Sequence, residues 1–209
     1  MFRSRIIIAG IAVLLGAAAA LVGSSMYASK QKQLDEQNLV GLIAETTTLL
    51  RQALATPTKE SIGAIDAGLE RLKSSRSRAF AGAAEQYIIK AREIARWCID
   101  SERFGREAAA ARQALIAHMN RSARRDTAWI RDALELKRRV ESVHTDLARS
   151  LRALDDLLYG LVDAQKVLAP FVEASALLPD AEREQARARA QQEAKRAEVE
   201  LLKVRNITP

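Results

Sequence analysis

The 112 residues from Thr58 to Ala169 contain no proline, although Pro57 and Pro170 stand at the two borders of this stretch. Proline interrupts helices more strongly than any other residue, so a run of this length permits helices of many turns. The chain has only 9 glycines in 209 residues, and it is rich in alanine, leucine, arginine and glutamate, which lose little side-chain freedom in a helix. No stretch alternates apolar and polar residues as a half-buried strand does. We therefore predict an all-α fold.

A seam of large aliphatic residues marks the most regular helix. Its members recur at intervals of three and four residues, the spacing typical of a coiled coil, with one irregularity between residues 147 and 151. Because such a seam must be covered by other apolar side chains, it predicts that this helix lies in a bundle. The seam consists of Leu136, Val140, Val143, Leu147, Leu151, Leu154, Leu158 and Leu161.

The same kind of spacing predicts helices over residues 34–55 and about 77–118, the second with Leu115 and Met119 on its inner face. Thr56 is expected to cap a new helix that has Pro57 at its first position. A reversal is predicted at residues 120–126, with Asp126 as the cap of the seam helix. The two long helices would each reach about 60 Å. Residues 34–73 would form a third rod of similar length, broken at Pro57, and complete an elongated antiparallel bundle.

The last segment, residues 179–209, is highly charged and has few large apolar residues before its end. It predicts either a solvated helix or a partly disordered arm. The apolar residues at its far end are a candidate docking patch, with folding back onto the bundle as the alternative. They are Leu201, Leu202, Val204 and Ile207.

Residues 6–28 form an uncharged run near the N-terminus. As a helix they would extend about 34 Å, enough to cross a hydrocarbon core of about 30 Å. The alternative is a cleaved signal peptide, with residues 1–5 as its basic region and residues 18–20 as an A-x-A cleavage site. We favour the uncleaved signal-anchor because apolar residues continue beyond that site and an interfacial aromatic residue follows. The span is marked by Ile6, Gly16, Ala20, Val22 and Tyr27.

Arg3 and Arg5 precede this run, and their charge favours a cytoplasmic N-terminus. The chain is thus predicted to be a single-pass protein of a bacterial inner membrane with its body in the periplasm; secretion to the periplasm after signal cleavage is the alternative. The predicted organisation is an N-terminal membrane anchor over residues 1–29, a helical coiled-coil bundle over 30–178 and the charged arm over 179–209.

The composition argues against several functional classes. Beyond residue 29 there are 31 basic and 26 acidic residues, interleaved, and aromatics make up only 4% of the chain, which does not predict nucleic-acid binding. Phosphate-binding and nucleophile-elbow motifs do not occur. Cys98, the single cysteine, is predicted to pack in the core. Glu141 and His144 have the Glu-x-x-His spacing of di-iron helices, but no second pair exists, so we interpret them as a solvated face.

We therefore predict no enzyme activity, no cofactor, no metal and no small-molecule substrate. The predicted function is that of a membrane-anchored structural or interaction protein that scaffolds or spaces components of an envelope complex. Its partners would be the membrane and other proteins bound through helical packing, including a second copy of the chain. A periplasmic sensor or ligand-binding bundle that acts through partner subunits is the alternative. The layout also resembles that of inner-membrane spanins of phage lysis systems, in architecture alone and without a shared motif, which would imply a lysis protein.

Overall fold

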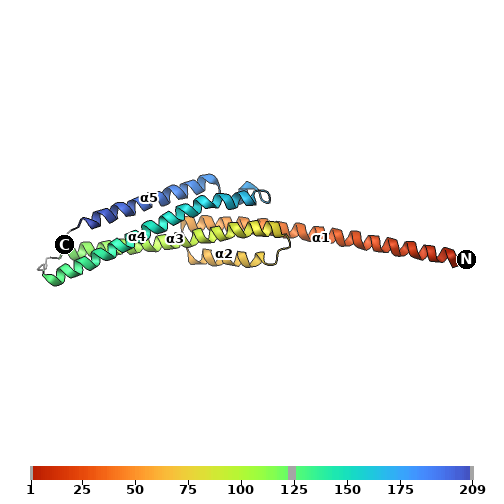
Figure 1. Cartoon of the computed structure of the whole chain (residues 1–209), viewed down its shortest axis with the longest axis horizontal. Helices are drawn as coiled ribbons and strands as arrows, with labels where there is room; N and C mark the ends of the chain where they lie inside the picture. The colour runs from red at the N-terminus through yellow and green to blue at the C-terminus, as the bar shows by residue number, and fades with distance from the viewer. Residues whose placement is uncertain (1, 122–125, 208–209) are drawn as a thin grey trace.

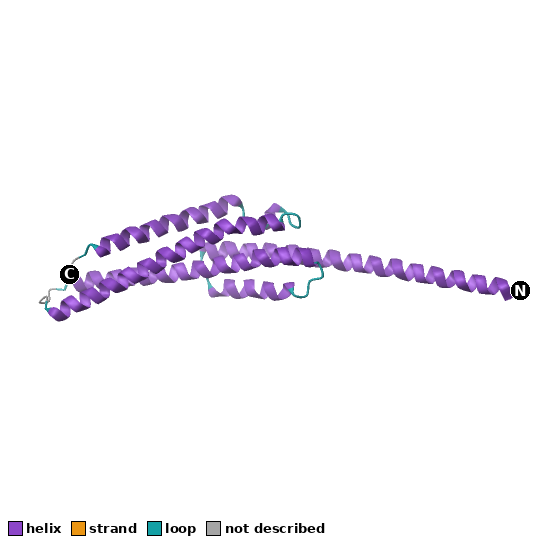
Figure 2. Cartoon of the chain, viewed as in Figure 1, coloured by secondary structure: helices purple, strands orange, loops and turns teal. Residues whose placement is uncertain are grey.

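The computed structural model describes the backbone of residues 2–121 and 126–207, and the side chains of residue 27 and of residues 29–121 and 126–207. All regular structure in these residues is helical, which confirms the all-α prediction (Figure 2). A short 3-10 helix, η1, lies between the last two α-helices. The elements are α1 Phe2–Ala55, α2 Lys59–Leu72, α3 Arg78–Met119, α4 Thr127–Leu168, η1 Ala174–Ala176 and α5 Asp180–Arg205.

The antiparallel pair α3 and α4 forms the spine of the bundle (Figure 1). Each helix has 42 residues, so each is about 63 Å long. The Asp126 carboxylate caps α4 by accepting a hydrogen bond of 2.8 Å from the Trp129 amide. At its other end α4 stops just before Pro170, which has no amide hydrogen to continue the helical hydrogen bonds. The predicted reversal between the two helices is therefore present; its residues 122–125 lie outside the described part of the chain.

The prediction of a single third rod over residues 34–73 is wrong. The chain turns back after α1, and α2 lies antiparallel beside it: Arg71 donates hydrogen bonds of 2.9 and 3.2 Å to Glu45. Pro57 cannot continue the helix, and the connection of residues 56–58 is short enough for a helical hairpin. The residue that caps α2 is Thr58, not Thr56, since the Thr58 hydroxyl accepts from the Ser61 amide at 3.3 Å.

Helix α5 provides the third layer for the other half of the spine. Figure 1 shows the α1–α2 hairpin beside one half of α3 and α4, and α5 alongside α4 over the remaining half. The segment predicted as a charged arm is thus a helix that packs against the bundle. Its buried residues are mostly alanines, which allow the two helix axes to approach closely. They are Arg183, Ala190, Ala194, Ala197 and Val204.

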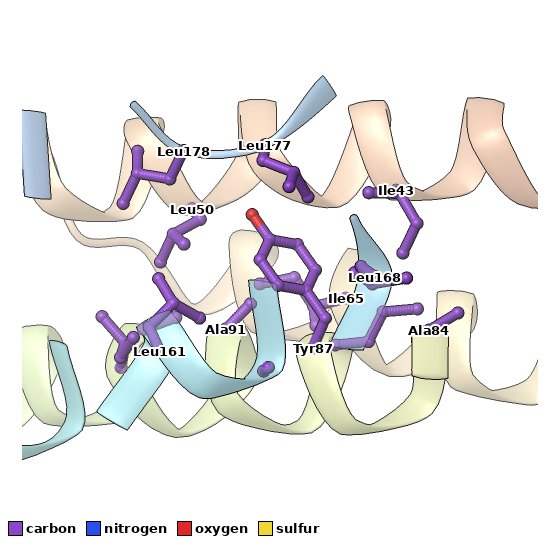
Figure 3. Close-up of a cluster of buried hydrophobic side chains, with 14 of the residues drawn as sticks. Ile43, Leu50, Ile65, Ala84, Tyr87, Ala91, Leu161, Leu168, Leu177 and Leu178 are labelled. Carbon is purple, nitrogen blue, oxygen red and sulfur yellow. The ribbon is translucent and has the colours of Figure 1, made fainter. Parts of the chain in front are cut away.

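The apolar interior consists of two clusters. The larger one joins side chains of α1, α2, α3, the second half of α4 and the α4–α5 connection around Tyr87 (Figure 3). The smaller one lies toward the other end of the spine and contains Ala111 and Leu115 of α3, Val140 of α4 and Val204 of α5. The two halves of the spine are therefore covered by different elements.

The α4–α5 connection, residues 169–179, is held in place by buried polar side chains. The Thr47 hydroxyl donates to the Ala176 carbonyl at 2.7 Å and shares a hydrogen bond of 2.8 Å with the Tyr87 hydroxyl. Gln165 donates from Nε2 to the Leu178 carbonyl at 2.7 Å. In Figure 3 the Tyr87 hydroxyl points toward this connection. Desolvation raises the pKa of Tyr87, so the phenol is neutral and available as a hydrogen-bonding group. The loop carbonyls thus obtain the partners that a buried backbone requires.

We expect Thr47→Val to destabilise the protein more than Tyr87→Phe. Valine removes the donor to the Ala176 carbonyl and leaves the Tyr87 hydroxyl with only its backbone hydrogen bond to Leu178, at a cost of about 1–3 kcal/mol, whereas phenylalanine leaves the Thr47–Ala176 bond intact. The free energy of unfolding from urea titrations of the two variants measures the difference. Equal losses would contradict the role assigned to Thr47.

Candidate functional site

The bundle has one end from which α1 projects toward Phe2 (Figure 1). We call this the proximal end, and define it as residues 29–36 of α1, the α2–α3 connection at residues 73–77, the first turn of α3 and the neighbouring residues 167–171. It brings together segments that are about 40 residues apart or more in the sequence. Because α1 enters the bundle at this end, we take the proximal end as the first candidate site.

Asp35 of α1 organises the proximal end. Its Oδ2 atom accepts hydrogen bonds from the Ser75 hydroxyl at 2.8 Å and from the amides of Arg76 and Ser77 at 2.8 and 3.0 Å. These amides precede α3, whose Ser77 makes no side-chain cap of its own. A carboxylate is favourable next to the positive end of a helix dipole. Asp35 therefore caps α3 from another helix.

The pKa of Asp35 lies below its ordinary value. Partial desolvation works in the opposite direction, but the hydrogen bonds from Ser75, Ser77 and Arg76, together with the charge of Arg76, outweigh it. The carboxyl is consequently ionised throughout the neutral range. Its contribution to stability is present above the unfolded-state pKa and is lost as the pH falls through the lower folded-state pKa.

A groove of about 320 Å³ forms the second candidate site. It lies where α1 ends and α5 begins, above the middle of the spine. Leu151, Leu154 and Cys98 line its floor, and the ion pair between Arg51 and Glu182, with 2.7 Å between Nε and Oε2, stands at its rim. An apolar floor with a charged rim suits an apolar or amphipathic molecule.

Cys98 is buried, and its surroundings raise the pKa of the thiol to about 12 by desolvation. The thiolate is the reactive form of cysteine, and it is hardly populated near neutral pH at such a pKa. This agrees with the predicted packing role and gives the groove no nucleophile.

The interpretation of Glu141 and His144 as a solvated face is wrong for the histidine. His144 is buried with 5% exposure, and its Nδ1 atom lies 2.9 Å from the Val140 carbonyl of the preceding turn. Glu141 is half-buried. Among the residues that the structure describes, no group of three or more histidine, cysteine or acidic side chains is placed to hold a metal ion.

Sequence reasoning also missed His118. His118 is buried on the inner face of α3. Met119, which was predicted to lie on that face, is only half-buried. The imidazole stacks on the Trp129 ring with 5.0 Å between centroids, and Nε2 lies 3.0 Å from the Trp129 carbonyl. The spacing Ala108, Ala111, Leu115, His118 continues the intervals of three and four, and this was the available signal. The pair closes the tip of the α3–α4 hairpin.

The predicted seam faces the interior of the bundle to different degrees. Val140, Leu151, Leu154, Leu158 and Leu161 are buried, and the others, Leu136, Val143 and Leu147, are half-buried. Leu154, Leu158 and Leu161 pack in the larger cluster with residues of α1 and α3, while Leu136 and Val140 belong to the smaller one.

The four residues of the candidate docking patch do not form one exposed surface. Val204 is buried in the smaller cluster and Ile207 packs against it, while Leu201 is half-buried and Leu202 remains 58% exposed. Lys137 fixes this end of the chain by donating to the carbonyls of Arg205 and Ile207 at 2.8 and 2.7 Å. The C-terminal end is therefore folded back onto the bundle, as the alternative prediction had it.

The predicted membrane span coincides with the first half of α1. The side chains of Ile6, Gly16, Ala20 and Val22 lie outside the described residues; that of Tyr27 is exposed and accepts a hydrogen bond of 2.9 Å from Gln31. Among the residues whose side chains the structure describes, no helical stretch is both long and apolar enough to cross a membrane.

Comparisons with known proteins give no further assignment: no protein-family model, no curated protein and no solved structure matches the chain.

We predict that Asp35→Asn lowers the melting temperature at neutral pH and has little effect at acidic pH. The loss at neutral pH should correspond to about 0.3–1 kcal/mol, the typical contribution of a negative charge beside a helix N-terminus, because the asparagine oxygen can still accept hydrogen bonds. The difference between the two proteins should close as the pH falls below the ordinary aspartate value of 3.8 and through the lower pKa of the folded state. Melting curves of both proteins over that range test this, and a pH-independent difference would contradict it.

We expect His144→Ala to destabilise the bundle by about 1–3 kcal/mol because it opens a cavity in the α4 interface. Leu202→Ala, an exposed truncation on α5, is the matched control and should be nearly neutral. Chemical denaturation with and without a chelator separates packing from metal binding. A chelator that reproduces the effect of His144→Ala would overturn the packing interpretation.

Proposed function

We propose that the protein is a single-pass membrane protein whose helical body scaffolds or spaces components of a bacterial envelope complex. In this proposal the N-terminus is cytoplasmic, residues 6–28 cross the inner membrane and the bundle stands in the periplasm.

The observation that carries the proposal is the continuity of α1, which runs from Phe2 to Ala55 as one helix. Its first half contains the uncharged run, and its second half contributes Leu39, Ile43 and Leu50 to the core. Between residue 28 and residue 39 the helix rises only about 16 Å. An anchor in the first half would therefore hold the bundle at a fixed and short distance from the bilayer, which is what a spacer requires.

The body supports the same role through its shape and surface. The spine is about 63 Å long, and several large apolar side chains are exposed on the described surface. Ile130 and Leu134, one turn apart near the far tip of α4, are 40% and 38% exposed. A contact there would join a partner protein at a defined distance from the membrane.

A sensor function is a second candidate, and the groove between α1 and α5 favours it. A ligand that bound between these helices would bias the position of α1, and hence of the proposed anchor. The scaffold proposal requires no such ligand and needs only the packing that is already present.

The mature protein should retain residues 1–28, and protease added to spheroplasts should remove its C-terminus. Intact-mass measurement and immunodetection of a C-terminal tag report on the two points, with intact cells as the control. A mature N-terminus near residue 21 would instead indicate secretion after signal cleavage. A tail protected in spheroplasts would place the body in the cytoplasm.

A photo-crosslinking residue at Leu134 tests the scaffold part in living cells. We expect discrete adducts with envelope proteins, and none from the same residue at Arg106, which lies on an exposed face of α3. Absence of adducts at Leu134 together with ligand-dependent protection of the groove would favour the sensor.

A further inference from the structure

Two cationic segments meet at the proximal end. Residues 29–34, SKQKQL, and residues 73–78, KSSRSR, contain five basic residues and no acidic one. The two segments are in contact, because Arg76 donates from Nη1 to Gln31 Oε1 at 2.8 Å rather than to a carboxylate. All five cations are exposed: Lys30, Lys32, Lys73, Arg76 and Arg78.

The carboxylates next to this cluster have partners within the protein. Asp35 accepts the hydrogen bonds of the α2–α3 connection. Glu36 lies 3.8 Å from Lys32, and Glu70 pairs with Lys73 at 2.6 Å. The five basic residues and these three carboxylates together have a net charge of +2.

An exposed aromatic residue lies at the same end. Phe171, at the start of the α4–α5 connection, stacks on Phe80 in the first turn of α3, with 5.0 Å between ring centroids and 9° between planes. Phe80 is fully buried, but Phe171 is 38% exposed and Val167 nearby is 45% exposed. Cations beside exposed apolar side chains are typical of surfaces that lie in a membrane interface.

The position along α1 specifies which surface this end would meet. If residues 6–28 span the bilayer, residue 35 lies about 10 Å beyond the span. The polar headgroup layer is about 5–8 Å thick on each side of the hydrocarbon core. Lys30 and Lys32 would thus lie at headgroup depth, and the α2–α3 connection, tied to Gln31 and Asp35, would lie at its outer edge.

We propose that the proximal end binds the anionic phospholipid headgroups of the same bilayer that holds α1. This inference rests on the proposed anchor. The five cations contact lipid phosphates, and Phe171 enters the interface between them. Each basic residue held near an anionic surface contributes about 1 kcal/mol, so neutralising three of them should shift the ratio of docked to undocked bundle roughly a hundredfold. The contact seats the bundle on the membrane and limits its tilt.

The full chain in lipid nanodiscs provides the test. One set of discs contains only phosphatidylcholine, and the other contains equal parts of phosphatidylcholine and phosphatidylglycerol. A fluorophore on Ser74→Cys, in a Cys98→Ala background, reports proximity to headgroups that carry a quencher. The variant Lys73→Gln/Arg76→Gln/Arg78→Gln is compared with Lys59→Gln/Arg96→Gln/Lys195→Gln, which removes the same charge from exposed residues elsewhere.

We expect stronger quenching in the anionic discs, and loss of this excess in the proximal variant but not in the control variant. Raising the salt from about 0.1 M to about 1 M shortens the screening length from about 10 Å to about 3 Å. It should therefore also abolish the excess quenching of the labelled protein that retains all five cations. This salt titration keeps the test valid if a variant fails to fold.

Equal quenching in both kinds of disc, or equal losses in both variants, would overturn the lipid contact. Failure of the anchor is distinguishable, because the chain would then leave the neutral discs altogether and both proposals would fall. If the chain stays in neutral discs and its quenching does not depend on lipid charge, only the proposed lipid contact is overturned.

Discussion

The Thr47 hydroxyl is the point on which the arrangement of helices depends. The connection between α4 and α5 turns against the interior of the bundle, where an unpaired carbonyl is costly. Thr47 of α1 donates to the Ala176 carbonyl and also bonds the Tyr87 hydroxyl of α3, so one side chain fixes the relative position of three elements. Gln165 of α4 performs the same task for the Leu178 carbonyl. The connection can therefore lie among leucines without leaving these two carbonyls unsatisfied.

The direction of α5 follows from this connection. Gln165 accepts a hydrogen bond of 3.2 Å from Arg183, whose buried guanidinium also contacts the carboxylates of Asp180 and Glu184 at the first turn of α5. From there α5 runs along α4 with its alanines inward and an ion pair between Arg187 and Asp155 at 2.9 Å. Since α1 ends where α5 begins, their meeting leaves the groove above Cys98. The groove thus lies at the place where α5 replaces α1 as the neighbour of the spine.

Large aliphatic residues made the spine predictable, and small or polar ones did not. The seam from Leu136 to Leu161 and the missing prolines define α4 because burial of such side chains dominates the energetics of packing. The alanine face of α5 carries little hydrophobic signal, so folding back onto the bundle was predicted only as an alternative for its far end. The burial of His144 depends on a backbone carbonyl in its own helix, and the Asp35 cap joins residues 40 apart in sequence. The cations at 73–78 are visible in the sequence, but their contact with 29–34 requires the hairpin of α1 and α2.

The packing of α1 also bears on the choice between a spacer and a sensor. No glycine or proline occurs from residue 24 to residue 40, so this part of the helix contains none of the residues that usually mark a kink. At the bundle end Asp35 is tied to the α2–α3 connection, and farther along Ile43 and Leu50 are fully buried. A shift of α1 past α3 would have to break the Asp35 cap, move both aliphatic residues out of close-packed positions and separate Thr47 from two partners at once. Close-packed interfaces resist small sliding motions and change only between discrete arrangements. With these contacts in place, α1 is suited to transmit the position of a membrane anchor to the bundle without adjustment, which is the mechanical property that a spacer needs.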